Sequence, residues 1–379
     1  MFFLALVYDF YKVKEARHFF YWLAAFVLII VSGVRYHVGL DSIRLAEWYD
    51  ECPDLLGLNL DYIDDYRHRY QPLWLVFSAS CKLIVKDFFF LQLMQSLMVN
   101  SLIFYYIKKT TSFAFSSVLI YYLLAYVLFN FEIMRESMAV AMAIVAYLNF
   151  ERRRWFIYLL FGAIAFYLHV SGLMVLFYPL IARVKMKSHT IIFAYSLVIF
   201  VNIIYAQYID LMFALLSSNT DTISGHILTY ARAGNIGNTW KYYVSIYFNG
   251  MLLPLSSLYL YRRFSGYNYK YGSMVLVFSV FSLLGNQSVA FLRFSNYLII
   301  FYIILSGSLL QLFLRRISPR IPYALAFCFL ISFTFLYSLS KPVPRLDGVY
   351  TYSRYYPYRT IILIRLDADR ELWSRKEFN

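Results

Sequence analysis

The chain has 379 residues, of which 61% are hydrophobic and 21% aromatic, and its mean hydropathy is +0.58. A soluble domain of this length does not carry so much apolar surface, so the composition predicts an all-α polytopic membrane protein with about 11–13 transmembrane helices. The net charge of +14 does not indicate nucleic acid as a partner, because most basic residues sit in short runs between apolar segments.

Apolar segments of membrane length follow one another without a linker, so we expect one transmembrane domain over 1–338 and a tail over 339–379. Residues 1–11 form a shorter apolar stub interrupted by Asp9, either half a span or the remnant of a longer helix. The predicted spans are 19–34, 88–107, 112–130, 132–150, 155–169, 170–182, 190–208, 240–261, 272–287, 291–314 and 321–338.

Basic clusters between these segments set the predicted direction of the chain. They hold nearly half of the 35 lysines and arginines and few acids, so the positive-inside rule assigns all of them to the cytoplasm. The clusters are Lys12/Lys14/Arg17, Lys108/Lys109, Arg152/Arg153/Arg154, Arg183/Lys185/Lys187, Arg262/Arg263/Lys270 and Arg315/Arg316/Arg320. The loops 35–71 and 209–239 and the tail 339–379 then face outward, and the first of these loops holds more acids than arginines.

One segment does not fit a simple count of crossings. The chain must cross an odd number of times between Gln71 outside and Lys108 inside, yet both 72–86 and 88–107 are hydrophobic. We predict that 72–86 is a short interfacial or re-entrant helix, because it carries polar residues and is short against the ~20 residues of a span. Re-entrant backbone at membrane depth needs protein or a water-filled cavity around it, so this segment is expected to line a functional site.

Four ionisable residues interrupt the apolar chain where this topology places the outer face: Arg35, Arg135, His169 and Arg293. An ionisable residue near membrane depth is costly and is usually kept for a function. The three arginines offer planar donor forks suited to phosphate oxygens, and the histidine can serve as an acid or a base near neutral pH. Together they indicate a site for an anionic substrate.

Each of the four also has a structural interpretation. Arg35 and Arg293 stand at helix ends, where an arginine commonly anchors a span at the interface. Arg135, near a helix start, has Glu132 and Glu136 as possible internal partners. His169 has the usual alternative of a hydrogen-bonded structural histidine. All four residues lie at the same predicted face of the membrane and have side chains that can carry positive charge, and this favours one shared site.

No other chemical motif is present in the sequence, which lacks a P-loop, a Rossmann fingerprint, HExxH and GxSxG. The three cysteines have no metal or redox spacing and are expected to serve packing. No carboxylate cluster indicates a metal site, so neither a metal nor a cofactor is expected. Acids of the outer loop are candidates for a general base, although most are expected to form a solvated face: Asp41, Glu47, Asp50, Asp64 and Asp65.

At these positions the chain resembles the EpsG family of Wzy-type polysaccharide polymerases. The resemblance follows the family's order over most of the chain and lies in Arg35-Tyr36-His37-Val38-Gly39-Leu40-Asp41, Gln71-Pro72, Arg135, His169, Arg293 and Tyr356-Pro357-Tyr358. Each motif is short, so the specificity lies in the ordered set. One position departs from the pattern, because the family's acid before Pro72 is Gln71 here. If that acid is a base in relatives, the role moves to another residue, such as Asp41, Glu47, Asp65 or His169.

The resemblance implies a metal-independent glycosyltransferase of the bacterial inner membrane, with a GT-C-like architecture and 1–338 as the catalytic domain. A growing glycan on a polyprenyl pyrophosphate would be transferred to a lipid-linked repeat unit at the periplasmic face, giving O-antigen, capsule or exopolysaccharide. The expected catalytic residues are His169, Asp41 and Arg135. The residues expected to bind pyrophosphate or sugar are Arg35, Arg135, Arg293, Gln71, Tyr70 and Tyr358. Membrane lipid and a chain-length regulator protein are the expected partners.

Two rival classes stay open on the sequence. An O-antigen ligase, or another polyprenyl-phosphate-dependent glycosyltransferase, would use a similar site. A polysaccharide flippase or exporter would move the glycan without making bonds. The products separate them, because a polymerase gives a ladder of repeat numbers, a ligase gives single transfers, and an exporter leaves the length unchanged.

Overall fold

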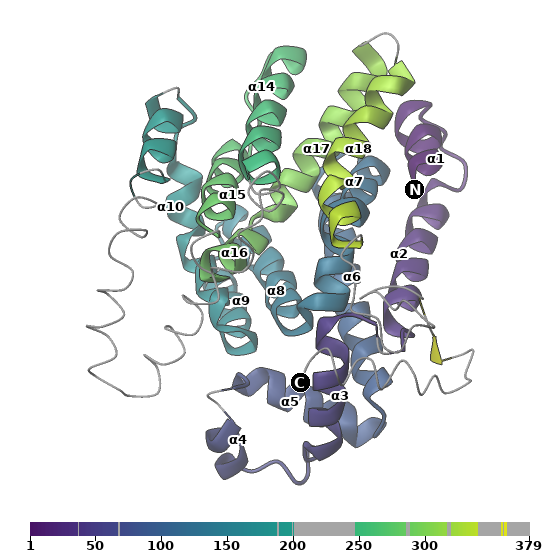
Figure 1. The fold of residues 1–379 in the computed structure, drawn as a ribbon, viewed down its shortest axis with the longest axis vertical. Helices are drawn as coiled ribbons and strands as arrows, with labels where there is room; N and C mark the ends of the chain where they lie inside the picture. Colours follow the sequence, from purple (N-terminus) through teal and green to yellow (C-terminus); the bar gives the residue numbers. More distant parts are fainter. Residues whose placement is uncertain are drawn as a thin grey trace, which may run out of the picture. The chain divides into compact units, whose positions relative to one another are not determined.

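The protein is built from helices throughout the part of the chain that the computed structural model describes (Figure 1). That part comprises residues 1–36, 38–66, 69–187, 189–198, 200, 247–285, 289–316, 320–339, 358, 360 and 361. Within it the only β pairing is one isolated bridge between Arg35 and Thr360. The prediction of an all-α fold is confirmed.

Three helices in the described ranges are long and apolar enough to cross a membrane: Phe88–Thr110, Ala114–Glu132 and Ile299–Arg316. Shorter apolar helices accompany them: Arg17–Gly33, Pro72–Ile84, Trp155–Leu168, Val170–Arg183, His189–Val198, Gly272–Leu284 and Ile321–Ser332. This is the multi-pass helical architecture predicted for the chain. The number of crossings stays a prediction.

The chain forms two compact units. Unit 1 contains Met1–Val175 and Leu325–Asn379, and unit 2 contains Leu176–Ala324. The prediction of one membrane domain over 1–338 with a separate tail is not tested by this division. The predicted outer loop 209–239 lies outside the described residues, as does most of the tail.

Unit 1 holds most of the predicted site. Its elements are α1 (Phe2–Leu4), η1 (Ala5–Phe10), α2 (Arg17–Gly33), α3 (Leu40–Glu51), α4 (Leu60–Tyr66), α5 (Pro72–Ile84), α6 (Phe88–Thr110), α7 (Ala114–Tyr121), η2 (Tyr122–Tyr126), η3 (Leu128–Glu132), α8 (Met134–Glu151) and α9 (Trp155–Leu168), and η4 (Val170–Phe177) begins in it. The predicted spans up to 155–169 are present within a few residues. The segments η2 and η3 are π-helical, and they continue α7 as far as the turn before α8.

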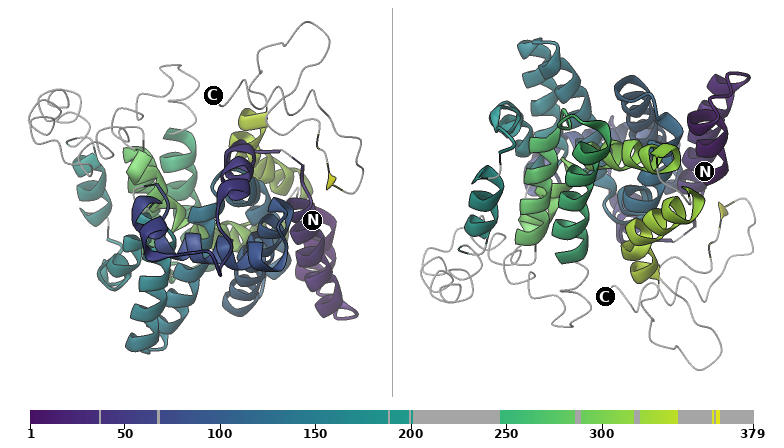
Figure 2. Two further views of the ribbon diagram at one scale, coloured as in Figure 1. Left: turned by 90° about the horizontal axis from the view of Figure 1, so that it is seen from below. Right: turned by 90° about the horizontal axis from the view of Figure 1, so that it is seen from above.

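The predicted loop 35–71 contains two helices, α3 and α4. Helix α3 forms because Leu45, Trp48 and Tyr49 recur at helical spacing, and all three are buried. Its C-terminus is capped by Lys82 of α5, whose Nζ donates to the carbonyls of Tyr49, Asp50 and Cys52 at 2.6, 2.9 and 2.6 Å. Figures 1 and 2 show α3, α4 and α5 gathered where α2 ends and α6 begins, and we call this region the α3–α5 end.

Helix α5 confirms that a short helix starts at Pro72. Proline occupies its first turn, where its missing N–H costs nothing, and the helix has 13 residues. A short link leads to α6, which Asp87 caps by accepting a hydrogen bond from the Phe89 N–H at 3.0 Å. The interfacial or re-entrant position of α5 stays a prediction.

A buried polar network joins the helices behind the α3–α5 end. Asn100 of α6 donates to Asn130 Oδ1 at 2.8 Å, and Tyr121 donates to Asn100 Oδ1 at 2.8 Å. Gln95 donates to Ser137 Oγ at 2.8 Å. Such bonds connect α6 to η3 and α8 where apolar contacts alone would allow the helices to slide, and they therefore hold the turn between η3 and α8 in place.

Unit 2 contains α10 (Tyr178–Arg183), the helix His189–Val198, η6 (Phe248–Leu252), α14 (Leu253–Ser265), α15 (Gly272–Leu284), α16 (Val289–Asn296) and α17 (Ile299–Arg316), and α18 (Arg320–Leu339) begins in it. The prediction of one span over 291–314 is wrong, because the helix breaks at Tyr297 and Leu298. The side chain of Ser295 accounts for part of the break, since its hydroxyl donates to the Leu292 carbonyl at 2.7 Å.

Candidate active site

Arg135 stands in the first turn of α8 and faces the segment that leads into α5. Its Nη1 donates to the Arg69 carbonyl at 3.0 Å, and its guanidinium lies over the Tyr70 ring, 4.8 Å from the centroid. The side chain is partly exposed. A guanidinium has five N–H donors, and only one hydrogen bond ties this one to the described residues, so it retains donors for a ligand.

The alternative of an internal ion pair for Arg135 is not supported. Glu132 and Glu136 are both buried, and neither forms an ion pair with Arg135 in the described part of the chain. The positive end of α8 adds to the charge of the guanidinium. An anion bound here would therefore be stabilised by the guanidinium and by the N-terminus of α8.

Two tryptophan rings pack in series against Tyr70. Tyr70 is buried, and its ring centroid lies 4.3 Å from that of Trp48, which lies 6.4 Å from that of Trp74. The rings come from α3, the 69–71 segment and α5. This packing holds the Tyr70 ring in place. The cation–π contact with that ring in turn holds the Arg135 guanidinium.

Gln71 follows directly and precedes Pro72. Its backbone carbonyl begins α5 by accepting from the N–H groups of Trp74 and Leu75 at 3.0 and 3.2 Å. Its side-chain Oε1 is buried and has no hydrogen-bond donor among the described residues. A buried acceptor without a donor is costly, so it is a candidate to accept a hydrogen bond from a ligand.

Arg35 packs against the turn between η3 and α8, and it is fully buried. Its guanidinium donates to the carbonyls of Ser32 and Val38, the latter at 3.1 Å, and lies 4.9 Å from the Phe131 ring centroid. Nη2 also contacts the Met134 sulfur at 3.1 Å. These contacts give Arg35 a structural role in addition to its predicted role in binding substrate.

The segment after Arg35 is held against the same turn. Gly39 has φ of +98°, and a Cβ added to it would collide with the Phe131 carbonyl. Both features require glycine. The Arg35–Asp41 run and the η3–α8 turn therefore form one packed structure, with Met134 contacting Arg35 and the next residue, Arg135, turned to Tyr70.

The tail reaches this region as well. The Tyr358 hydroxyl donates to the Val31 carbonyl, and the Ile361 N–H donates to the Val34 carbonyl at 3.0 Å. Burial raises the pKa of the Tyr358 hydroxyl, and the Arg35 guanidinium acts in the opposite direction. Arg35 and Tyr358, both predicted to bind substrate, are therefore close enough to influence each other.

His169 ends α9 and is buried at 5% exposure. Its Nδ1 lies 2.6 Å from the Ser171 hydroxyl, and the Ser171 backbone N–H donates to Nδ1 at 3.3 Å. Because that N–H needs an acceptor, Nδ1 carries no proton in the neutral ring and Nε2 does. In this tautomer Nε2 carries the proton and cannot accept another.

The other predicted site residues are placed less fully. Asp41 lies in α3, and its side chain is outside the described residues. Arg293 lies in the last turn of α16 in unit 2 and is partly exposed. The structure thus gathers Arg35, Arg135 and their contact residues in unit 1, and it does not test whether Arg293 joins them.

Several contributing residues were missed by sequence reasoning. Gln92 of α6 donates to the carbonyls of Gly33 and Arg35 at 3.0 and 2.9 Å and so caps the end of α2. Its signal was a glutamine inside an apolar span, which is kept when it satisfies backbone groups. Phe131 and Met134 carried no such signal, because apolar residues beside a turn are ordinary in a membrane helix.

The described part of the chain is a multi-pass helical membrane protein in which Arg35 and Arg135 lie against aromatic rings in unit 1. The chain is a member of the EpsG family, whose model matches residues 18–360. This membership indicates a polysaccharide polymerase of the Wzy type that lies in a membrane and serves polysaccharide biosynthesis. Comparisons with curated proteins and with solved structures gave no match.

Proposed function

We propose that the protein polymerises lipid-linked repeat units at the outer face of the bacterial inner membrane. A glycan on a polyprenyl pyrophosphate is the donor, and a single lipid-linked repeat unit is the acceptor. The acceptor hydroxyl oxygen bonds to the anomeric carbon, while the bond from that carbon to the pyrophosphate oxygen breaks. The bonding electrons leave with the pyrophosphate, and the hydroxyl proton passes to a base.

The observation that best supports this proposal is the setting of Arg135. Its guanidinium is held by one backbone carbonyl and one aromatic ring, is partly exposed, and stands at a helix N-terminus. A donor fork fixed in this way stabilises charge that develops on a leaving pyrophosphate. Because arginine supplies that stabilisation, we propose that no metal is required.

We propose roles for the other predicted site residues from the chemistry of their side chains. Gln71 Oε1 can accept a hydrogen bond from a sugar hydroxyl, although a carboxamide cannot act as a base. His169 in its Nε2–H form donates and so orients an oxygen of the acceptor or donor. The base is then an acid of the 35–71 segment, for which Asp41 is our candidate.

The test is synthesis with the purified protein in lipid nanodiscs. Supplied with polyprenyl-pyrophosphate repeat units, it should convert them into a ladder of products that differ by one repeat. An unchanged length would favour an exporter, and a single transfer to a lipid A core acceptor would favour a ligase. Either result would overturn the proposal.

His169 provides a sharper prediction about the mechanism. Replacing it with alanine should lower the polymerisation rate about 100-fold, since hydrogen-bond donation to a reacting group contributes roughly that much. His169→Gln should recover part of the rate, because the glutamine amide can donate from a similar position. Equal loss in the two variants, measured as initial rates at matched protein levels, would indicate instead that the histidine transfers a proton.

A further inference from the structure

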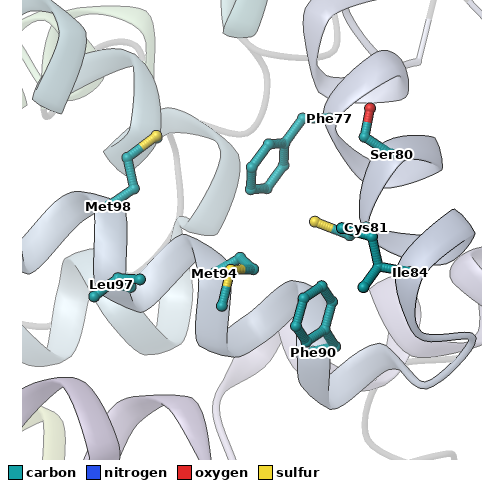
Figure 3. Close-up of a pocket in the computed structure, with 8 residues that line it drawn as sticks. All are labelled: Phe77, Ser80, Cys81, Ile84, Phe90, Met94, Leu97 and Met98. Atoms are coloured by element: carbon teal, nitrogen blue, oxygen red, sulfur yellow. The ribbon is translucent and has the colours of Figure 1, made fainter.

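An apolar cavity lies between α5 and α6 in unit 1. It has a volume of about 370 Å³, and side chains from the two helices enter it from opposite sides (Figure 3). Its lining includes Phe77, Ser80 and Cys81 from α5 and Met94 and Leu97 from α6. The sulfur of Cys81 points into this space in Figure 3.

The cavity lies level with the candidate active site along α6. Gln92 and Gln95 of α6 bond to the Arg35 carbonyl and to Ser137. Met94, in the same turn, points to the cavity instead. One face of α6 therefore holds the arginine-bearing turn, and another face forms the cavity wall.

Helix α5 connects the two places directly. It starts directly after Gln71, next to Tyr70, whose ring contacts Arg135, and it reaches the cavity at Phe77. Six residues of helix span about 9 Å, which is the order of separation between a headgroup and the first part of its tail. The rise of α5 therefore places the cavity at a distance that suits the tail of a ligand whose anionic group lies at Arg135.

The lining suits a branched hydrocarbon. Ser80 is its one polar side chain, and that hydroxyl is already used in donating to the Val76 carbonyl at 2.7 Å. Methionine side chains adapt to irregular apolar shapes. A cavity of roughly 150 Å³ holds a six-carbon ring, so this volume corresponds to about fifteen carbons, or three isoprene units.

We propose that this cavity binds the headgroup-proximal isoprene units of the lipid-linked substrate. The assignment rests on the proposed function for the identity of the lipid, and it adds the location of its tail. The tail would fix the pyrophosphate beside Arg135 and would distinguish a polyprenyl carrier from the straight acyl chains of bulk phospholipid.

Photocrosslinking tests the location without requiring polymerisation. The full-length protein, carrying p-benzoylphenylalanine in place of Leu97 at the cavity edge, is placed in nanodiscs with radiolabelled undecaprenyl pyrophosphate. We expect labelling that excess unlabelled undecaprenyl pyrophosphate removes and that excess phosphatidylglycerol does not. The control is the same substitution at Leu159 of α9, which is exposed at 53%. Equal labelling at the two positions, or equal competition by phosphatidylglycerol, would mean that the cavity holds only membrane lipid and would overturn the inference.

Filling the cavity gives a second, kinetic readout. Met94→Trp should raise the KM for the lipid-linked substrate about tenfold with a smaller change in kcat, while Leu159→Trp leaves both unchanged. If the enzyme polymerises normally with the cavity filled, the tail site is wrong and the proposed function stands. If undecaprenyl pyrophosphate labels the cavity specifically but no ladder forms with the natural protein, the tail site stands and the polymerase proposal fails.

Discussion

Replacing Arg135 with alanine should lower chain extension by about 100- to 1000-fold while the protein stays folded in the membrane. Loss of one donor to developing negative charge typically has an effect of this size. The fold should survive because the side chain is partly exposed and makes one hydrogen bond to the described residues. The measurement is the initial rate of ladder formation by the purified variant, together with its thermal unfolding.

Two further variants make the result specific. Arg135→Lys keeps the positive charge but loses the planar donor fork, so its rate should fall between those of the natural protein and the alanine variant. Arg152→Ala removes an exposed arginine after the opposite end of α8 and should leave the rate unchanged. Full activity in Arg135→Ala would remove the central residue of the proposed site.

Replacing Arg35 with alanine should instead destabilise the protein. The guanidinium is fully buried and donates to the carbonyls of Ser32 and Val38. Removing it leaves buried acceptors without donors, each at a cost of about 1–3 kcal/mol, and opens a void against the Phe131 ring. We expect the apparent Tm to fall by about 5 °C or more and the amount of folded protein to fall with it.

The comparison between the two arginines is the informative result. Arg35→Ala should lose stability first and activity as a consequence, whereas Arg135→Ala should lose activity alone. A cationic replacement, Arg35→Lys, cannot reach both carbonyls with the same geometry and should recover little stability. An Arg35→Ala protein of normal stability that fails only to bind undecaprenyl pyrophosphate would restore the purely ligand-binding interpretation.

Much of the fold could be predicted from hydrophobic length and charge. The helices α2, α6, α8 and α9 lie within a few residues of their predicted spans, because a run of apolar residues bounded by charges has few other solutions in a membrane. The break at Tyr297 was not predictable in this way, since its neighbours are as apolar as a continuous helix requires. The helices α3 and α4 were missed because both are short and rich in acidic residues, and only α3 has buried residues among those described.

The candidate site was predictable in its residue types and less so in its geometry. Arg35 and Arg135 were selected as two ligands of the same kind, yet one is buried as a structural element and the other is turned outward to Tyr70. Tertiary contacts with Phe131, Met134 and the 69–71 segment decide whether an arginine here is a buried structural residue or a partly exposed candidate for binding a ligand. These contacts join positions far apart in the chain and leave no local pattern in the sequence.

The return of the tail to α2 has a consequence for biogenesis. The bond from Tyr358 to Val31 joins positions separated by 327 residues. A chain emerging from the ribosome inserts α2 early but cannot complete this contact until α18 and the residues up to 358 have been synthesised. The end of α2 is therefore among the last parts of unit 1 to reach its final form, and truncation before residue 358 should be recognised by quality-control proteases as an unfinished protein.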